Sequence, residues 1–250
     1  MDYIVSFKIH DIRIFNDTNN LAESFSSEFI SEVDHQLLNK ERVNIALSGG
    51  STPKFFFQKL VSLKDKFKWE RIYFFWGDER CVPPDDPESN YGMAKEYLFD
   101  HIEIPGDNIK RIKGENNPNF EAKRYSEIIK KNIPEVNGLP CFEIMILGLG
   151  EDGHTASIFP DQMELLSSDD ICTLASHPAT KQNRITLTGK VINNSKKIFF
   201  LVTGKNKSSV VSEIINEKRN FLEYPAYHIK SLNGELVWFL DKEAASALNN

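Results

Sequence analysis

The sequence predicts an α/β fold: a doubly wound, mostly parallel sheet with helices on both faces. Short apolar runs of strand length recur along the 250 residues, and segments with helical spacing lie between them. The runs are mostly continuous rather than alternating, which is typical of strands covered on both faces. No internal repeat or long linker divides the chain, so we expect residues 1–250 to form a single domain.

Six segments are expected to be strands because each is a run of mostly apolar residues. They are 43–47, 71–76, 142–147, 184–187, 197–203 and 235–240. Ligands of doubly wound sheets bind beyond the carboxyl ends of the strands. The polar loops that follow these runs are therefore the segments in which we look for a site.

Helices are expected between the strands. The first is indicated by apolar residues that recur every four positions behind the capping candidates Asn16 and Asp17. These apolar residues are Leu21, Phe25, Phe29, Val33 and Leu37. Thr52 followed by Pro53 predicts an N-cap and a helix through Leu63. Helical spacing also recurs over 120–132 and 207–218.

Composition and charge point to a soluble globular protein. Apolar residues make up 40% of the chain, which is enough for a real core. The longest apolar runs, 72–76 and 198–202, are too short to cross a bilayer, and the N-terminal stretch lacks the apolar segment of a signal peptide. The net charge of −6 predicts no nucleic-acid or membrane surface, so an anionic substrate needs a local basic pocket.

Cysteine usage favours a reducing compartment. Cys81, Cys141 and Cys172 are odd in number, widely spaced and outside C-x-x-C pairs, which argues against a disulfide framework or a zinc site. We therefore expect a cytoplasmic protein. Nothing in the sequence decides between a monomer and a small homo-oligomer.

The most informative segment is 144–160, in which an apolar run ends in glycines, carboxylates and a histidine. Glycine lets the main chain approach a ligand closely. Histidine titrates near neutral pH and a carboxylate fixes its tautomer, so His154 with Asp152 is the best general base that the chain offers.

The same segment matches the dinucleotide fingerprint G-x-G-x-x-G, with Asp169 or Asp170 near the distance expected of a ribose-binding acid. The matching glycines are Gly148, Gly150 and Gly153. A pyrophosphate at this loop would face two adjacent carboxylates, and Pro160 ends any helix that begins here too early. A nicotinamide or flavin site is therefore disfavoured.

A second loop, between strand 43–47 and the next helix, has the residues of a phosphate receptor. It consists of Ser48, Gly49, Gly50, Ser51 and Thr52. Hydroxyl groups and the free N–H groups of a helix start bind a phosphate, and the helix dipole assists. No lysine follows in the Walker position, so a small phosphorylated metabolite is favoured over a mononucleotide. The alternative is a tight turn with a capping threonine.

Three charged residues follow strand 71–76 directly, at the start of a long polar loop over 77–90. They are Asp78, Glu79 and Arg80. Alternate side chains of an extended segment point in opposite directions, so neighbouring members of this run are expected to face different walls. A solvated loop or a structural ion pair is the alternative.

Two basic residues near strand ends could supply the counter-charge for an anion, although each could also be surface charge. Arg184 opens the strand 184–187, and Lys205 follows the strand 197–203. His177 and His228 lie in stretches without ligand spacing, so no metal is expected. A serine nucleophile is also disfavoured because no G-x-S-x-G elbow is present.

Together these motifs resemble the glucosamine-6-phosphate isomerase/6-phosphogluconolactonase family, and within it the lactonases. The resemblance covers roughly residues 43–245. It rests on L-S-G-G-S-T-P (47–53), W-G-D-E-R (76–80), S-N-Y-G-M-A (89–94), L-G-L-G-E-D-G-H-T-A-S-I-F-P (147–160), R-I-T-L-T (184–188), V-T-G-K (202–205) and W-F-L-D (238–241). It implies the fold of glucosamine-6-phosphate deaminase and ribose-5-phosphate isomerase, and hydrolysis of 6-phosphogluconolactone without a cofactor.

A mechanism follows as a hypothesis. The 48–52 loop, with Arg184 and Lys205, holds the 6-phosphate of the sugar. His154, oriented by Asp152, activates water for attack on the lactone carbonyl. Arg80 stabilises the oxyanion, and Asp78 orients Arg80 or contacts sugar hydroxyls.

Two other functions remain as alternatives. The resemblance implies that the related deaminases carry a glutamate where this chain has Phe159, so amino-sugar isomerisation is disfavoured. A sensor that binds sugar phosphates without turnover needs no base, which argues against it here.

Overall fold

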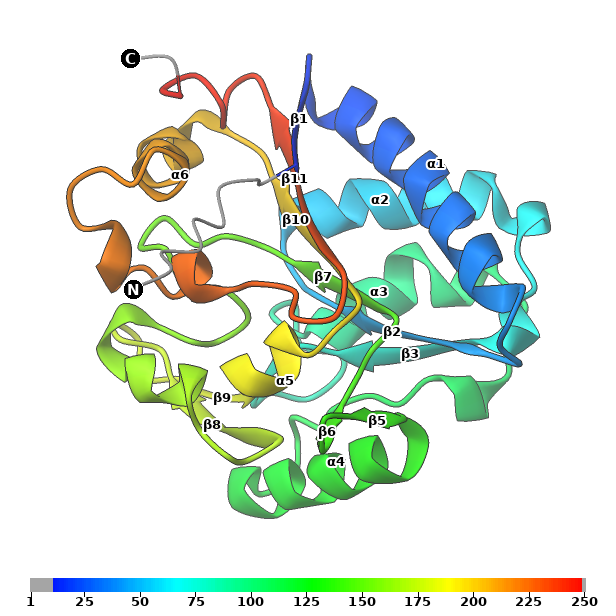
Figure 1. Ribbon diagram of the computed structural model, residues 1–250. Coiled ribbons are helices and arrows are strands. Elements are labelled where there is room, and N and C mark those ends of the chain that lie inside the picture. The colour runs from blue at the N-terminus through cyan, green and yellow to red at the C-terminus, as the bar shows by residue number, and fades with distance from the viewer. Residues whose placement is uncertain (1–10, 249–250) are drawn as a thin grey trace, which may run out of the picture.

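The structure is a computed structural model that describes residues 11–248 (Figure 1). The N-terminal stretch, in which no signal peptide is expected, lies outside the described residues in its first ten positions. A six-stranded sheet with the order β1-β11-β10-β7-β2-β3 forms the centre, and every neighbouring pair in it is parallel. Its strands are β1 (Asp11–Phe15), β2 (Val43–Leu47), β3 (Ile72–Trp76), β7 (Ile144–Leu147), β10 (Lys197–Val202) and β11 (Glu235–Asp241). The predicted α/β class is confirmed.

The chain reverses its direction of winding between β2 and β7. From β2 it passes to β3 on one side, and it later returns to place β7 on the other side of β2. Both strands are buried along their whole length, as their continuous apolar composition predicts. Because the loops that follow β2 and β7 depart in different directions, a crevice opens between them at the carboxyl edge of the sheet.

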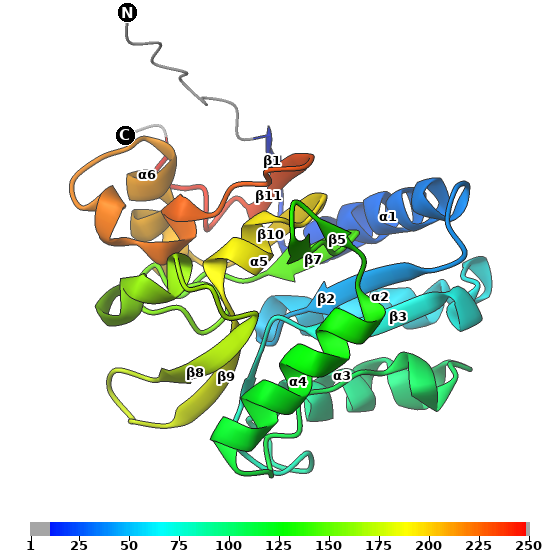
Figure 2. The same ribbon diagram turned by 60° about the horizontal axis from the view of Figure 1, so that its bottom comes forward.

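Helices cover both sides of this sheet, as expected. They are α1 (Thr18–Leu37), α2 (Ser51–Ser62), α3 (Asn90–Tyr97), α4 (Pro118–Asn132), α5 (Gly189–Asn193) and α6 (Ser208–Ile215). Figure 1 shows α1 and α2 side by side along one face, and Figure 2 shows α4 and α5 toward the other. Shorter 3-10 turns join several of these elements, the longest of them at Pro160–Leu166.

Aromatic rings fill the space between α1, α2 and the sheet. The ring of Phe25 lies 4.6 Å from that of Phe56, 5.1 Å from Phe199 and 5.2 Å from Phe239, measured between centroids. The four-residue period in α1 therefore marks the buried face of a real helix. Asp17 is its N-cap, and the Asp17 carboxylate accepts a hydrogen bond from the backbone N–H of Asn20 at 2.8 Å.

The strand expected at 184–187 exists, but it is not part of the parallel sheet. It is β9 (Asn183–Leu187), which pairs antiparallel with β4 (Asp78–Arg80) and β8 (Cys172–Ser176). Figure 2 shows this second sheet beside α4. Gly77 joins the two sheets, because its N–H donates to the carbonyl of Leu47 and its carbonyl accepts from Leu187. An apolar run shows that a strand is buried, but it does not say which sheet the strand joins.

Other boundaries differ from the sequence-based expectation. The helix after β2 begins at Ser51 with Gly50 at the N-cap (φ 107°), so Thr52 is not the cap. Part of the 77–90 loop is strand β4, and the helix expected at 207–218 ends at Ile215. Strand β1 and the short hairpin of β5 (Glu135–Val136) and β6 (Leu139–Pro140) were not predicted. The hairpin strands have two residues each, too few for periodicity to detect, and β1 lacks the buried, continuous apolar run by which the other strands were predicted.

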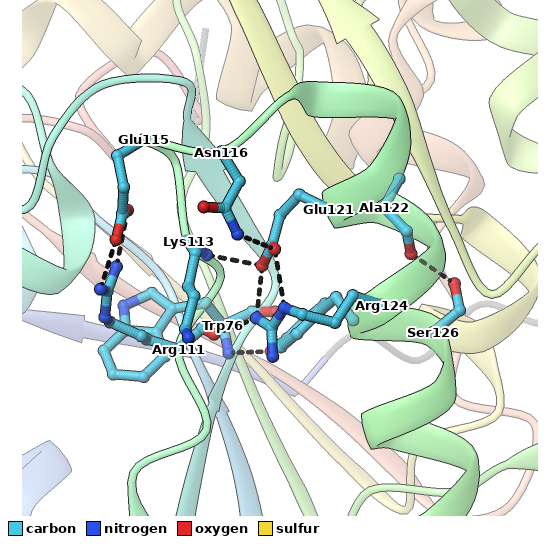
Figure 3. A network of polar contacts seen from close by, with 10 residues as sticks. Trp76, Arg111, Lys113, Glu115, Asn116, Glu121, Ala122, Arg124 and Ser126 are labelled. Atoms are coloured by element: carbon cyan, nitrogen blue, oxygen red, sulfur yellow. Dashed lines mark hydrogen bonds and ion pairs between the residues drawn. The ribbon is translucent and has the colours of Figure 1, made fainter.

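A buried carboxylate anchors α4 to the segment that precedes it (Figure 3). Glu121 is 1% exposed and accepts hydrogen bonds from the backbone N–H of Lys113 at 2.6 Å, the Asn116 amide at 2.9 Å and the Arg124 guanidinium. One turn later, the buried Tyr125 hydroxyl bridges the N–H and carbonyl of Trp76 at 2.7 and 3.1 Å. Helix α4 is thus fixed to the end of β3, next to the charged run.

Residues 11–248 contain neither a membrane-spanning helix nor a cluster of metal-binding side chains. None of their helices combines the length and the apolar character needed to span a bilayer. Their His, Cys, Asp and Glu side chains form no group of three or more suited to holding a metal ion.

We expect Tyr125→Phe to lower the free energy of unfolding by about 1–3 kcal/mol, because it leaves the buried peptide groups of Trp76 without their partner. The matched control is Tyr227→Phe, whose hydroxyl donates to Glu217 at 3.3 Å near the surface and whose loss should change stability by less than about 0.5 kcal/mol. Urea denaturation measures both. Equal effects of the two substitutions would contradict the anchoring role of Tyr125.

Candidate active site

A cavity of about 170 Å³ lies at the carboxyl edge of the sheet, where the loops after β2 and β7 diverge. It is lined by Ser48, Gly49, Gly50, Asp78, Arg80, Asn90, Gly148, Leu149, Gly150, His154, Ala156, Arg184 and Lys207. Two larger hollows, of about 630 and 790 Å³, have no histidine in their lining. The smaller cavity is the candidate site because it gathers a base, several cations and two glycine loops.

Glycine is required where two of these loops pack against side chains of the cavity. A Cβ atom at Gly49 would lie 1.7 Å from Oδ1 of Asn90, and one at Gly150 would lie 2.1 Å from Nδ1 of His154. Any larger residue at either position must displace a side chain that lines the cavity. The glycines thus allow the close approach of backbone and functional groups.

His154 and Asp152 form a hydrogen-bonded pair, with Nδ1 of the histidine 2.5 Å from Oδ1 of the aspartate. An ionised carboxylate only accepts hydrogen bonds, so Nδ1 carries the proton and Nε2 keeps its lone pair. Burial raises the pKa of Asp152, but its hydrogen bonds with His154 and the positive charge of the ring when it is protonated outweigh burial, so the pKa is lowered. The buried Phe159 ring packs against the imidazole, with 4.7 Å between the ring centroids.

Two arginines lie side by side on adjacent strands of the small antiparallel sheet. Arg80 and Arg184 are directly paired in the β4–β9 register, and both line the cavity. The Nε atoms of both are buried and have no hydrogen-bond partner among residues 11–248. Burial lowers the pKa of Arg184, and the charge of Arg80 lowers it further. Two guanidinium groups with unpaired Nε donors in one cavity favour an anionic ligand.

Lys207 adds a third cation. Burial lowers the pKa of the Lys207 ammonium, while the charges of Glu151 and Asp152 act in the opposite direction. A lysine that is partly desolvated beside a cavity binds an anion more strongly than one in water, because the local dielectric constant is lower.

The charged run of β4 divides as the alternation of a strand predicts. Asp78 and Arg80 line the cavity, whereas Glu79 lies outside its lining and is buried. Asp78 accepts a hydrogen bond from the Ser157 hydroxyl at 2.6 Å, and the Asn90 amide lies 3.4 Å from its other oxygen. The expectation that Asp78 orients Arg80 finds no contact to support it. Instead, Asp78 ties β4 to the loop that carries His154.

The structure brings together most, but not all, of the residues expected at the site. Ser51, Thr52 and Lys205 do not line the cavity, and Asp152 reaches it only through His154. Ser51 is exposed, and the Thr52 hydroxyl instead hydrogen-bonds that of Thr203 at 2.8 Å. The remaining predicted residues share the cavity: Ser48, Gly49, Gly50, Asp78, Arg80, His154 and Arg184.

Sequence reasoning missed two residues of the cavity. Lys207 lies two positions after Lys205 in the same 3-10 turn, but only Lys205, which does not line the cavity, was singled out from the sequence. Asn90 begins α3 and stands in the 89–94 motif, which was used only for the resemblance. No spacing rule identifies either residue, because both depend on how a turn is oriented in space.

The family model described as glucosamine-6-phosphate isomerases/6-phosphogluconolactonase matches residues 16–238. The chain belongs to this family. The predicted resemblance is confirmed. The glycine loop also lacks the helix that a dinucleotide fingerprint would begin. The first helical element after Gly148–Gly153 is the 3-10 turn that begins at Pro160.

Relatives of known name cover almost the whole chain. A 6-phosphogluconolactonase of Haemophilus influenzae is 43% identical over 238 residues, which are 94% of this chain and 98% of the relative. That of Treponema pallidum is 37% identical over 214 residues, 85% of this chain and 89% of the relative. The crystal structure of 6-phosphogluconolactonase from Thermotoga maritima has a TM-score of 0.82 at 30% identity and covers 94% of this chain and 100% of its own.

We expect His154→Ala to raise the pKa of Asp152, because the hydrogen bond and charge that lower it are removed. Carboxyl carbon NMR shifts followed with pH measure this change. Asp169 is the control, since its pKa is lowered by the hydrogen bond and charge of Lys190 and should not move. An unchanged pKa of Asp152 would refute the pairing.

The lowered pKa of Asp152 also makes the stability of the fold depend on pH. Because the pKa of Asp152 is lower in the folded than in the unfolded chain, its ionised form stabilises the fold above the ordinary pKa of an aspartate. This contribution disappears as the pH falls through the lowered value. The stability difference between wild type and His154→Ala should therefore shrink in acid.

Proposed function

We propose that this chain hydrolyses 6-phospho-D-glucono-1,5-lactone to 6-phospho-D-gluconate in the oxidative pentose phosphate pathway. One observation carries the proposal: the His154–Asp152 pair opens on the same cavity as Arg80, Arg184 and Lys207. A base beside a cluster of cations suits an anionic substrate that reacts with water. The names of the relatives agree with the predicted enzyme class, a carboxylic ester hydrolase.

The phosphate is held by cations and by the backbone of the first glycine loop. Arg184 and Lys207 supply positive charge, and the N–H groups of the 48–50 loop supply donors beside the positive end of the α2 dipole. Binding the phosphate fixes the lactone ring, so that its carbonyl meets the base in one orientation.

His154 then acts as general base. Its Nε2 takes a proton from a water molecule, whose oxygen attacks the lactone carbonyl to form a tetrahedral intermediate. When the bond between the carbonyl carbon and the ring oxygen breaks, the imidazolium returns the proton to that oxygen. The products are a carboxylic acid and a hydroxyl group, so one water is consumed and the enzyme is unchanged.

Arg80 stabilises the negative charge that develops on the carbonyl oxygen. Its guanidinium is anchored by donating to the backbone carbonyl of Glu88, and its Nε remains buried without a partner among the described residues. A preorganised donor of this kind lowers the barrier without moving during the reaction.

Phe159 separates this proposal from amino-sugar isomerisation. The position holds a buried aromatic ring packed on His154, with the Arg184 guanidinium 5.7 Å above it. An apolar ring transfers no proton, so it cannot assist the opening of a sugar ring. Release of ammonia from glucosamine 6-phosphate would favour the rival function.

The direct test uses fresh 6-phosphogluconolactone with the purified chain, and follows acid release above the spontaneous rate. We expect turnover of the lactone and none of glucosamine 6-phosphate. Ligand-induced thermal stabilisation without turnover would instead identify a sensor.

His154→Ala should lower kcat by about 10²–10⁴-fold, the usual contribution of a positioned general base. The measurement is acid release under saturating substrate, with circular dichroism to establish that the variant is folded. Near-normal turnover in a folded variant would remove His154 from the mechanism.

Lys207→Gln should raise KM for the lactone more than it lowers kcat, because the ammonium binds a group remote from the reacting carbonyl. Lys205→Gln is the matched comparison, since Lys205 stands in the same turn but does not line the cavity. A larger KM effect at Lys205 would restore the assignment made from the sequence.

A further inference from the structure

The buried carboxylate of Glu79 has no part in the proposed chemistry, although it stands between Asp78 and Arg80. It is 2% exposed and lies outside the lining of the cavity. A buried carboxylate is unfavourable unless its oxygens are hydrogen-bonded, so the partners of Glu79 indicate why it is there.

Four donors converge on the two oxygens of Glu79. Oε1 accepts from the backbone N–H groups of Arg80 and Asn90, both at 2.8 Å. Oε2 accepts from the backbone N–H of Tyr91 at 2.8 Å and from the Ser89 hydroxyl at 3.1 Å. An ionised carboxylate offers acceptors to all four, whereas an amide would point its own N–H groups at one or two of the three backbone N–H donors.

These donors belong to segments that carry cavity residues. Arg80 contributes its guanidinium to the cavity, and Asn90 lies against Gly49 while its amide donates to the Asp78 carbonyl at 2.9 Å. The Glu79 carboxylate therefore joins β4 to the first turn of α3 and, through Asn90, to the first glycine loop. The Glu79 side chain thus links three segments that line the cavity.

We propose that Glu79 is a positioning residue, whose carboxylate fixes Arg80 and Asn90 in the cavity by accepting their backbone N–H groups. The proposal rests on the proposed function, which assigns to Arg80 the stabilisation of the oxyanion, and on the contact of Asn90 with Gly49 of the phosphate loop. Loss of the carboxylate lets the end of β4 and the start of α3 move apart. The guanidinium then leaves the position at which it meets the reacting carbonyl.

The electrostatics of Glu79 agree with a constrained group. The pKa of Glu79 is raised to about 7. Burial raises it most and the charge of Asp78 adds to this, while the N–H groups of Tyr91, Asn90 and Arg80 lower it. The charge of Glu79 in turn raises the pKa values of Cys81 and Arg184. The three backbone donors thus favour the ionised form in a place where burial opposes it.

The test compares Glu79→Gln with a second buried carboxylate at the opposite end of the sheet. Glu143 is also 2% exposed and accepts from the Asn44 backbone N–H at 3.0 Å, the Asn44 amide at 2.9 Å and the Lys40 ammonium at 2.6 Å. It precedes β7, whose far end carries the cavity. We expect both Gln variants to lower the melting temperature, because both disturb a buried hydrogen-bond network.

Kinetics separate the two variants. Glu79→Gln should lower kcat/KM by about 10- to 100-fold, because displacing a catalytic group by about 1 Å or less has effects of this order. Glu143→Gln should stay within about twofold of wild type at a temperature where both are folded. Equal kcat/KM values for Glu79→Gln and wild type would overturn the proposal.

A double-mutant cycle tests whether Glu79 acts through Arg80. In the Arg80→Gln background the further effect of Glu79→Gln on kcat/KM should shrink to about a third or less, since coupled residues are not additive. Fully additive effects would mean that Glu79 does not position Arg80. If Glu79→Gln fails to fold, Ser89→Ala removes one of the four donors and keeps the carboxylate, and a loss of about threefold in kcat/KM is expected. No loss in a folded Ser89→Ala variant counts against the proposal.

Wild-type turnover is measured in the same assay and distinguishes the two possible failures. Absence of lactone hydrolysis by the wild type defeats the proposed function, whatever the variants do. Hydrolysis by the wild type with unchanged kcat/KM in a folded Glu79→Gln variant defeats only the role of Glu79.

Discussion

The reversal of winding between β2 and β7 is the constraint on which the site depends. Adjacent parallel strands end at the same edge of the sheet, and here the chain leaves them in opposite directions. The loop after β2 supplies backbone donors, and the loop after β7 supplies the histidine. Neither loop can close the gap with its own side chains, because glycines occupy the positions where the loops approach Asn90 and His154. The cavity therefore follows from topology, and the glycines keep it open.

A second, smaller sheet supplies what the parallel sheet cannot. Parallel strands deliver residues to one edge only, whereas the antiparallel pairing of β4 with β9 sets Arg80 directly opposite Arg184. Gly77 makes this possible, since its peptide groups bond to Leu47 of the first sheet and Leu187 of the second. Charge from a segment more than a hundred positions away along the chain thus reaches the same cavity as the charged run after β3.

The sequence predicted the parts of this protein whose signals are local. Continuous apolar runs revealed five of the six strands of the parallel sheet, all but β1, and the recurrence from Leu21 to Leu37 revealed α1. Loop chemistry revealed His154, Asp152 and the glycine loop. It could not assign β9 to a second sheet, because burial alone does not encode pairing. It also chose Lys205 over Lys207, since the direction in which a lysine points depends on the phase of a 3-10 turn rather than on its distance from a strand.

The like charges in the cavity show why this arrangement is not explained by folding alone. Arg80 and Arg184 repel each other across the β4–β9 pair, and both place a buried Nε without a partner among residues 11–248. An unsatisfied buried donor destabilises a fold by about 1–3 kcal/mol, and apolar residues at these positions would remove that strain. Proteins retain such local conflicts mainly at functional sites. A bound anion relieves both problems at once, because it accepts hydrogen bonds from the guanidinium groups and offsets their charge. The unfavourable part of the structure is therefore the part that its ligand completes.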